Sequence, residues 1–146
     1  MTATTPPPVA ARVVVVGSFN QDHGWRSERF PQPGETRLGR FSCGPGGKGF
    51  NQAIACARQG VATAFVGALG CDALGDAALA LAESEGLLAR CERVEGEATG
   101  TAAILLNDAG QNMIVVGPGG SLALAAAYIE AQRALIEGAA VLVTQH

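Results

Sequence analysis

Blocks of apolar and polar residues follow one another along the chain and predict strands and helices in turn. Val13–Val16 is an unbroken β-branched run, typical of a strand covered on both faces, and Val61–Leu69 and Ala140–Gln145 are also predicted to be buried strands. Apolar residues at helical spacing predict three helices, over Asn51–Gln59, Asp76–Gly86 and from Ser121, a candidate N-cap, to about Glu137. This alternation predicts an α/β fold with a mostly parallel sheet flanked by helices.

The segments between these elements are polar or rich in glycine. Asp22–Cys43 is polar and interrupted by prolines and glycines, with a candidate exposed strand over Glu35–Phe41. Arg90–Thr101 is predicted to be irregular or edge-like. Ala102–Leu106 and Asn112–Val116 flank a turn sequence and predict a hairpin. This hairpin and the polar segment are expected to form a small antiparallel appendage to the main sheet.

With 146 residues, the chain is about the size of one domain. Residues 1–12 include three consecutive prolines and predict a flexible leader, so the folded part is expected over residues 13–146. Val141–Val143 has the pattern of an interior parallel strand, yet almost no sequence follows that could pair beyond it. We therefore expect the sequence to be incomplete.

Charge and cysteine content exclude several classes of partner. The net charge is −3 at pH 7 and no run of Lys or Arg occurs, so nucleic acid is not an expected partner. No apolar run reaches the roughly 18 residues that span a bilayer, and no secretory signal is evident, so no membrane association is expected. The widely spaced cysteines predict no metal site and are expected to be reduced, in the cytoplasm: Cys43, Cys56, Cys71 and Cys91.

Gly44–Gly49 is a glycine-rich loop directly before the first predicted helix. It is not a P-loop, because Gly49 follows Lys48 where that motif needs Ser or Thr. Three of its glycines do fit G-x-G-x-x-G, and Asp72 follows at roughly the 20-residue spacing of a dinucleotide site. Such a loop normally ends the first buried strand, however, and that strand is Val13–Val16.

The glycine loop is better suited to a polar ligand. Consecutive glycines let backbone N–H groups approach a ligand closely, and the start of the following helix adds positive potential. Lys48 and Asn51 add hydrogen-bond donors at that helix start. The alternative is a glycine cluster that serves only a tight turn.

Several motifs then occur in the order known from one family. Gly46–Ala53 reads Gly-Gly-Lys-Gly-Phe-Asn-Gln-Ala and resembles the N-terminal signature of the ribokinase-like (PfkB-type) carbohydrate kinases. Further segments continue the match in order, namely Gly17–Asp22, Phe30–Thr36, Ala57–Gly60, Gly67–Gly75 and Thr99–Ala102. The chain is identified as a member of this family, most similar to the ribokinases.

The resemblance implies transfer of the ATP γ-phosphoryl group to a pentose such as ribose, with Mg²⁺ and a monovalent cation as further cofactors. It implies a lid over about residues 22–43 and 98–117, and a homodimer through the lid strands. The residues implied to bind the sugar are Asn20, Asp22, Gly46, Gly47, Lys48 and Asn51, with Ala102, Ile104 and Val116 as apolar lid contacts. Without the family, Asp22 could be a turn or cap residue, and the three lid residues ordinary strand packing.

The family's catalytic Asp lies in a Gly-Ala-Gly-Asp motif, which this sequence lacks. The resemblance therefore covers only the N-terminal half of the family pattern, no catalytic residue is assigned, and the chain alone is expected to be inactive. The leading hypothesis is that the chain is a truncated ATP-dependent sugar kinase that retains the sugar-binding half. The alternatives are a non-catalytic sugar- or nucleoside-binding module and a non-functional gene fragment without a stable fold.

Overall fold

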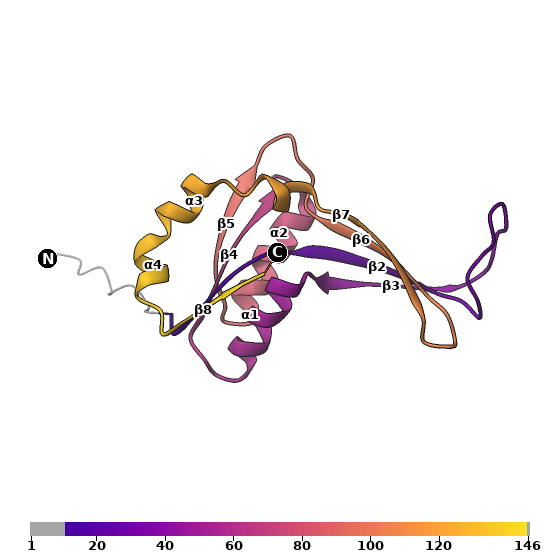
Figure 1. The fold of residues 1–146 in the computed structure, drawn as a ribbon, viewed down its shortest axis with the longest axis horizontal. Helices are drawn as coiled ribbons and strands as arrows, with labels where there is room; N and C mark the ends of the chain where they lie inside the picture. Colours follow the sequence, from indigo (N-terminus) through magenta and orange to yellow (C-terminus); the bar gives the residue numbers. More distant parts are fainter. Residues whose placement is uncertain (1–10, 146) are drawn as a thin grey trace, which may run out of the picture.

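The computed structural model describes residues 11–145, so most of the predicted leader lies outside the described residues. The main sheet has four parallel strands in the order β5-β4-β1-β8, namely β1 (Val13–Val16), β4 (Thr63–Gly70), β5 (Leu88–Val94) and β8 (Val141–Thr144). Helices lie on both sides of it (Figure 1), namely α1 (Lys48–Arg58), α2 (Ala73–Ser84), α3 (Ala126–Ala131) and α4 (Arg133–Glu137). The predicted α/β fold is confirmed.

Apolar side chains fill the space on each side of this sheet. One cluster joins the sheet to α1 and α2 through Phe50, Phe65 and Ala78. The other joins it to α3 and α4 through Val14 and Val66, against which Tyr128 packs. Every residue of β4 is buried, which explains its continuous apolar sequence.

A second sheet projects from the main one (Figure 1) and is called the lid below. Its strand order is β3-β2-β6-β7, with β2 (Asn20–Arg26), β3 (Arg40–Gly46), β6 (Thr101–Leu106) and β7 (Asn112–Gly117). The predicted hairpin is confirmed as β6 and β7. The lid is mixed rather than antiparallel as predicted, because β2 and β6 both run outward from the main sheet and pair in parallel.

Long-range contacts decide the structure of two predicted segments. The edge-like part of the first prediction is confirmed, because β5 is a regular strand at the edge of the main sheet whose backbone pairs with β4. The single helix predicted from Ser121 is three short ones, a 3₁₀ turn η1 (Gly119–Ala123) followed by α3 and α4. Ser121 does not cap a helix. Instead the Glu92 carboxylate of β5 accepts a hydrogen bond from Ala125 N–H at 2.9 Å, directly before α3.

The glycine-rich loop is also shorter than predicted. Gly44 to Gly46 belong to β3 and pair with β2, and α1 already begins at Lys48 rather than at Asn51. Only Gly47 lies between strand and helix. Because these glycines do not end β1, the dinucleotide-site alternative is wrong.

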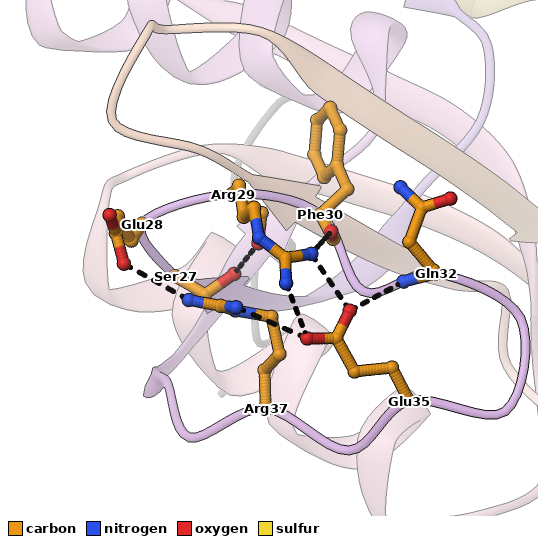
Figure 2. A network of polar contacts seen from close by, with 7 residues as sticks. All are labelled: Ser27, Glu28, Arg29, Phe30, Gln32, Glu35 and Arg37. Carbon is orange, nitrogen blue, oxygen red and sulfur yellow. Dashed lines mark hydrogen bonds and ion pairs between the residues drawn. The ribbon is translucent and has the colours of Figure 1, made fainter.

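The loop between β2 and β3 is held by an ion-pair network (Figure 2). Glu35 accepts hydrogen bonds from both terminal nitrogens of Arg29, at 2.8 and 2.6 Å, and from Gln32 N–H at 2.9 Å. Arg37 contacts Glu35 at 3.2 Å and Glu28 at 3.0 Å. The bonds from Arg29, foremost, and from the Gln32 N–H lower the pKa of Glu35 to about 2. The network orders a segment that has no helix or strand of its own.

The last strand, β8, pairs with β1 on one side, and no described strand pairs with its other edge. Val141 and Leu142 are about half exposed there, at 51% and 48%. A parallel strand of this composition is normally interior.

None of the helices in the described part of the chain is long and apolar enough to cross a membrane.

Candidate functional site

The start of α1 lies directly on the connection from β1 to β2. A Cβ atom on Gly49 would come within 2.8 Å of the Gly17 Cα, so both positions need glycine for this approach. Gly47 has a φ of +93°, and a side chain there would meet the Ser18 carbonyl. Phe50 N–H donates to that carbonyl at 3.2 Å. Backbone-to-backbone packing therefore fixes the start of α1 against the connection from β1 to β2, the first strand of the lid.

Asn20 and Asp22 point from one face of β2, since alternate residues of a strand share a face. Their partners on β3 are Gly46, opposite Asn20, and Gly44, opposite Asp22. A side chain on Gly46 would overlap the Asp22 carboxylate. The glycines of β3 therefore leave space that the two polar side chains of β2 use.

The Asp22 carboxylate takes part in none of the hydrogen bonds formed among the described residues, although it is partly buried. Burial raises its pKa, and the nearby His23 opposes this shift only in part. A carboxylate in such a place gains from ligand groups that donate hydrogen bonds.

The Asn20 side-chain oxygen Oδ1 is buried and has no hydrogen-bond partner in the described structure. It lies against Gly100, where a side chain would overlap it. A buried acceptor without a partner costs about 1–3 kcal/mol. A hydroxyl or N–H donor from a ligand would remove that cost.

Lys48 and Asn51 lie in the first turns of α1 and are exposed. They are three residues apart, which places them on the same face of the helix. No acidic residue occupies the first turn of α1. Donors on α1 and acceptors on β2 thus stand on either side of Gly46 and Gly47, an arrangement that suits a ligand with several hydroxyl groups.

The three predicted apolar lid residues share the face of Asp22. Ala102 pairs with Asp22 across β2 and β6, Val116 pairs with Ala102, and Ile104 is two residues further along. Ala102 is buried at 4% exposure, whereas Val116 is 49% exposed. They form an apolar surface next to the polar groups.

A cavity of about 710 Å³ opens beside these residues. Of the predicted site residues, Asn20 and Val116 line it, together with Gly17 and Ser18. Its other walls are largely apolar and come from η1, α3, α4 and β8, including Leu122, Leu124, Ile129, Ile136 and Leu142. Ser18 Oγ donates to Gln145 Oε1 at 2.9 Å at its edge.

Sequence reasoning gave no role to Thr99 and Gly100, and gave Asp72 only the acidic position of the dinucleotide-site alternative. Asp72 caps α2 by accepting from Gly75 N–H at 2.8 Å, and it also binds Thr99. Thr99 and Gly100 lie in a matched motif, which was the available signal. The contact of Thr99 with Asp72 joins residues 27 apart in the sequence, so it is not visible in local pattern.

Known proteins share both this sequence and this geometry. The model of the pfkB family of carbohydrate kinases matches residues 10–146. Ribokinase of Mus musculus is 36% identical over 138 residues, which cover 93% of this chain and 43% of the mouse protein.

Two solved structures superpose on the fold. Ribokinase from Giardia lamblia matches with a TM-score of 0.88 and 37% identity, over 93% of this chain and 42% of that one. Arabidopsis thaliana ribokinase, solved with ribose and ATP, matches with a TM-score of 0.75 and 33% identity, over 94% and 46%. The chain thus spans less than half the length of these relatives, and it belongs to the pfkB family of carbohydrate kinases.

Proposed function

We propose that this chain binds a pentose, ribose in the first instance, between the start of α1 and the lid. The observation that carries the proposal is the buried Asn20 Oδ1, which has no hydrogen-bond partner among residues 11–145. The neighbouring Asp22 carboxylate accepts no hydrogen bond from these residues either. Asp22 and Asn20 accept from sugar hydroxyls, and Lys48 and Asn51 donate to them. Ala102, Ile104 and Val116 contact the apolar face of the sugar.

Titration calorimetry with ribose tests this proposal directly. Asp22→Ala is expected to weaken binding about ten- to a hundredfold, or roughly 1.5–3 kcal/mol, because a charged hydrogen bond is lost. Glu95→Ala removes an exposed carboxylate outside the site and serves as the control. Absence of heat at millimolar ribose, in a chain that gives a cooperative thermal transition by circular dichroism, would overturn the proposal.

The same experiments separate the alternatives. A chain without a cooperative transition is the non-functional fragment. A chain that binds adenosine in preference to ribose is a nucleoside-binding module rather than a pentose site. Ribose binding with a cooperative transition supports the sugar-binding half of a kinase.

For the whole protein we propose transfer of the γ-phosphoryl group of ATP to the bound pentose. ATP would supply the phosphoryl group, and Mg²⁺ with a monovalent cation would position it and neutralise its charge. The residues described here do not fit that part of the site. They contain no cluster of three or more His, Cys, Asp or Glu side chains for a metal, and the sequence has no Gly-Ala-Gly-Asp motif.

A coupled ADP-release assay distinguishes binding from catalysis. This chain is expected to bind ribose and to release no ADP above the rate without sugar. Ribose-dependent ADP release by the chain alone would contradict the assignment of catalysis to residues outside it.

A cytoplasmic location would supply both ATP and a reducing environment for the four free cysteines.

The lid also has an apolar face that we propose as a homodimer interface. Strand register places Trp25, Phe41, Met113 and Val115 on the face opposite Asp22. Their exposed fractions are 41%, 56%, 55% and 75%, and the Trp25 and Phe41 rings lie 5.2 Å apart. Neighbouring exposed apolar side chains on a sheet favour self-association.

Sedimentation equilibrium tests the homodimer. Val115→Glu places a charge on the apolar face, at its most exposed residue, and is expected to shift the protein to monomer. Leu38→Glu, at a residue 97% exposed in the loop between β2 and β3, is the matched control and is expected to leave the dimer unchanged. A wild-type chain that stays monomeric at about 100 µM, roughly 100 times a micromolar dissociation constant, would refute the interface.

A further inference from the structure

We infer that Thr99, held by Asp72, is a positioning residue for sugar binding: it fixes Gly100, and through Gly100 the side chain of Asn20. The inference rests on the proposed function, because it assigns a cause to the geometry of the proposed site. It concerns residues that do not themselves line the cavity.

Asp72 and Thr99 join the start of α2 to the segment before β6. The Asp72 carboxylate accepts from Thr99 N–H at 2.8 Å and from the Thr99 hydroxyl at 2.6 Å. The same hydroxyl oxygen accepts from Gly70 N–H at 3.0 Å, at the end of β4. Thr99 is 1% exposed, so water has little access to its own donor and acceptor atoms. The Thr99 hydroxyl is thus both donor and acceptor between the main sheet and the lid.

Gly100 transmits this position to β2. Its carbonyl accepts from Gln21 N–H at 2.8 Å, between the two polar residues of the strand. A Cβ atom on Gly100 would overlap Asn20 Oδ1 and come within 2.8 Å of the Phe19 carbonyl oxygen. The Gly100 backbone therefore forms the wall behind the unpartnered Asn20 oxygen.

The neighbouring backbone leaves no room for Thr99 to shift without effect. A Cβ atom on Gly70 would lie 2.5 Å from Thr99 N, and one on Gly119 would overlap the Ala98 carbonyl. Gly120 N–H donates to the Ala98 carbonyl at 2.8 Å. Closely packed interiors transmit such displacements instead of absorbing them. Movement of Thr99 is expected to move Asn20.

The test compares Thr99→Val, which removes the hydroxyl at almost constant volume, with Thr99→Ser, which keeps it. Thr63→Val is the matched control, since Thr63 is also buried, at 3% exposure, and its hydroxyl donates to the nearby Val61 carbonyl at 2.8 Å. Ribose affinity is measured for all three after folding is checked by denaturant titration.

Thr99→Val is expected to weaken ribose binding about tenfold or more, whereas Thr99→Ser and Thr63→Val stay within about threefold of wild type. A purely structural role would lower the stability of both valine variants and leave their affinities alike. Equal affinities for Thr99→Val and Thr63→Val would therefore overturn the inference. Should Thr99→Val fail to fold, Asp72→Asn replaces it with the same expected loss.

Hydrogen exchange separates this inference from the proposed function. The Gln21 amide, bonded to Gly100, is expected to exchange faster in Thr99→Val than in wild type, and unchanged in Thr63→Val. This readout needs no sugar. A wild-type chain that does not bind ribose refutes the proposed function alone, whereas unchanged Gln21 exchange in Thr99→Val refutes the positioning role.

Discussion

Gly46 and Asp22 are so close that a methyl group on Gly46 would overlap all three atoms of the Asp22 carboxyl group. Gly46 lies on β3 and Asp22 on β2, diagonally across the paired strands. Gly46 does not have a positive φ, so its own backbone angles do not require glycine. The Asp22 side chain requires it, because the carboxyl group fills the space that a Cβ atom would need. The position of the carboxylate depends on the absence of a Cβ atom.

Gly46→Ala is expected to displace Asp22 and weaken ribose binding about tenfold or more, the cost of losing one charged hydrogen bond. Gly44→Ala is the matched control on the same strand, because a Cβ atom there would meet nothing within 4 Å. Calorimetry on both variants checks this. Equal affinities for the two would show that Asp22 does not depend on Gly46.

Asp22→Asn is expected to weaken ribose binding and to remove its dependence on acidic pH. Burial raises the pKa of Asp22 from 3.8, so in the wild type the charged acceptor is lost as pH falls through that raised value. Affinity measured between neutral and acidic pH should fall for wild type only. A parallel fall in the variant would assign the effect to another group.

The same substitution is expected to affect stability in the opposite direction. Because the folded pKa is raised, protonated Asp22 contributes stability that is present below pH 3.8 and lost as pH rises through the folded value. At neutral pH the free energy of unfolding should therefore be higher for the Asp22→Asn variant than for wild type. Denaturant titrations across this range should show the difference closing toward low pH.

Glu35→Gln is expected to destabilise the loop between β2 and β3 at neutral pH. The pKa of Glu35 is lowered from 4.5 to about 2, so its contribution is present above pH 4.5 and is lost as pH falls toward about 2. Residues 27–39 should exchange hydrogen faster in the variant than in wild type at neutral pH. This difference should decrease as pH falls from 4.5 toward about 2. Glu95→Gln, at an exposed carboxylate outside the network, should show no such change.

Phe50→Ala is expected to lower the free energy of unfolding by about 3–5 kcal/mol, because it empties the centre of the core below α1. The Phe50 ring meets Phe19 and Phe65 edge to face, with ring centroids 5.0 and 5.3 Å apart. Leu38→Ala, at a side chain 97% exposed, should change stability by less than about 0.5 kcal/mol. Denaturant titration gives both values, and similar losses would contradict this description of the core.

Local pattern alone predicted the elements whose residues carry their own signal. The β-branched run Val13–Val16 and the apolar segment before Gly70 are strands, and the hairpin of β6 and β7 follows its turn sequence. The ordered motifs predicted the family, which the comparisons confirm. These features depend on neighbours in the chain or on matched residues, so they can be read without a structure.

Only the tertiary structure decided which residues from distant segments contact one another. Residues 88–94 form a strand because β4 lies beside them, and the helix predicted from Ser121 is divided where Glu92 binds Ala125 N–H. The sequence by itself determined the residue types of the proposed site, including Asn20 and Asp22. Their geometry depends on contacts between distant segments, such as Asp72 with Thr99, and these energies arise only when the chain is folded.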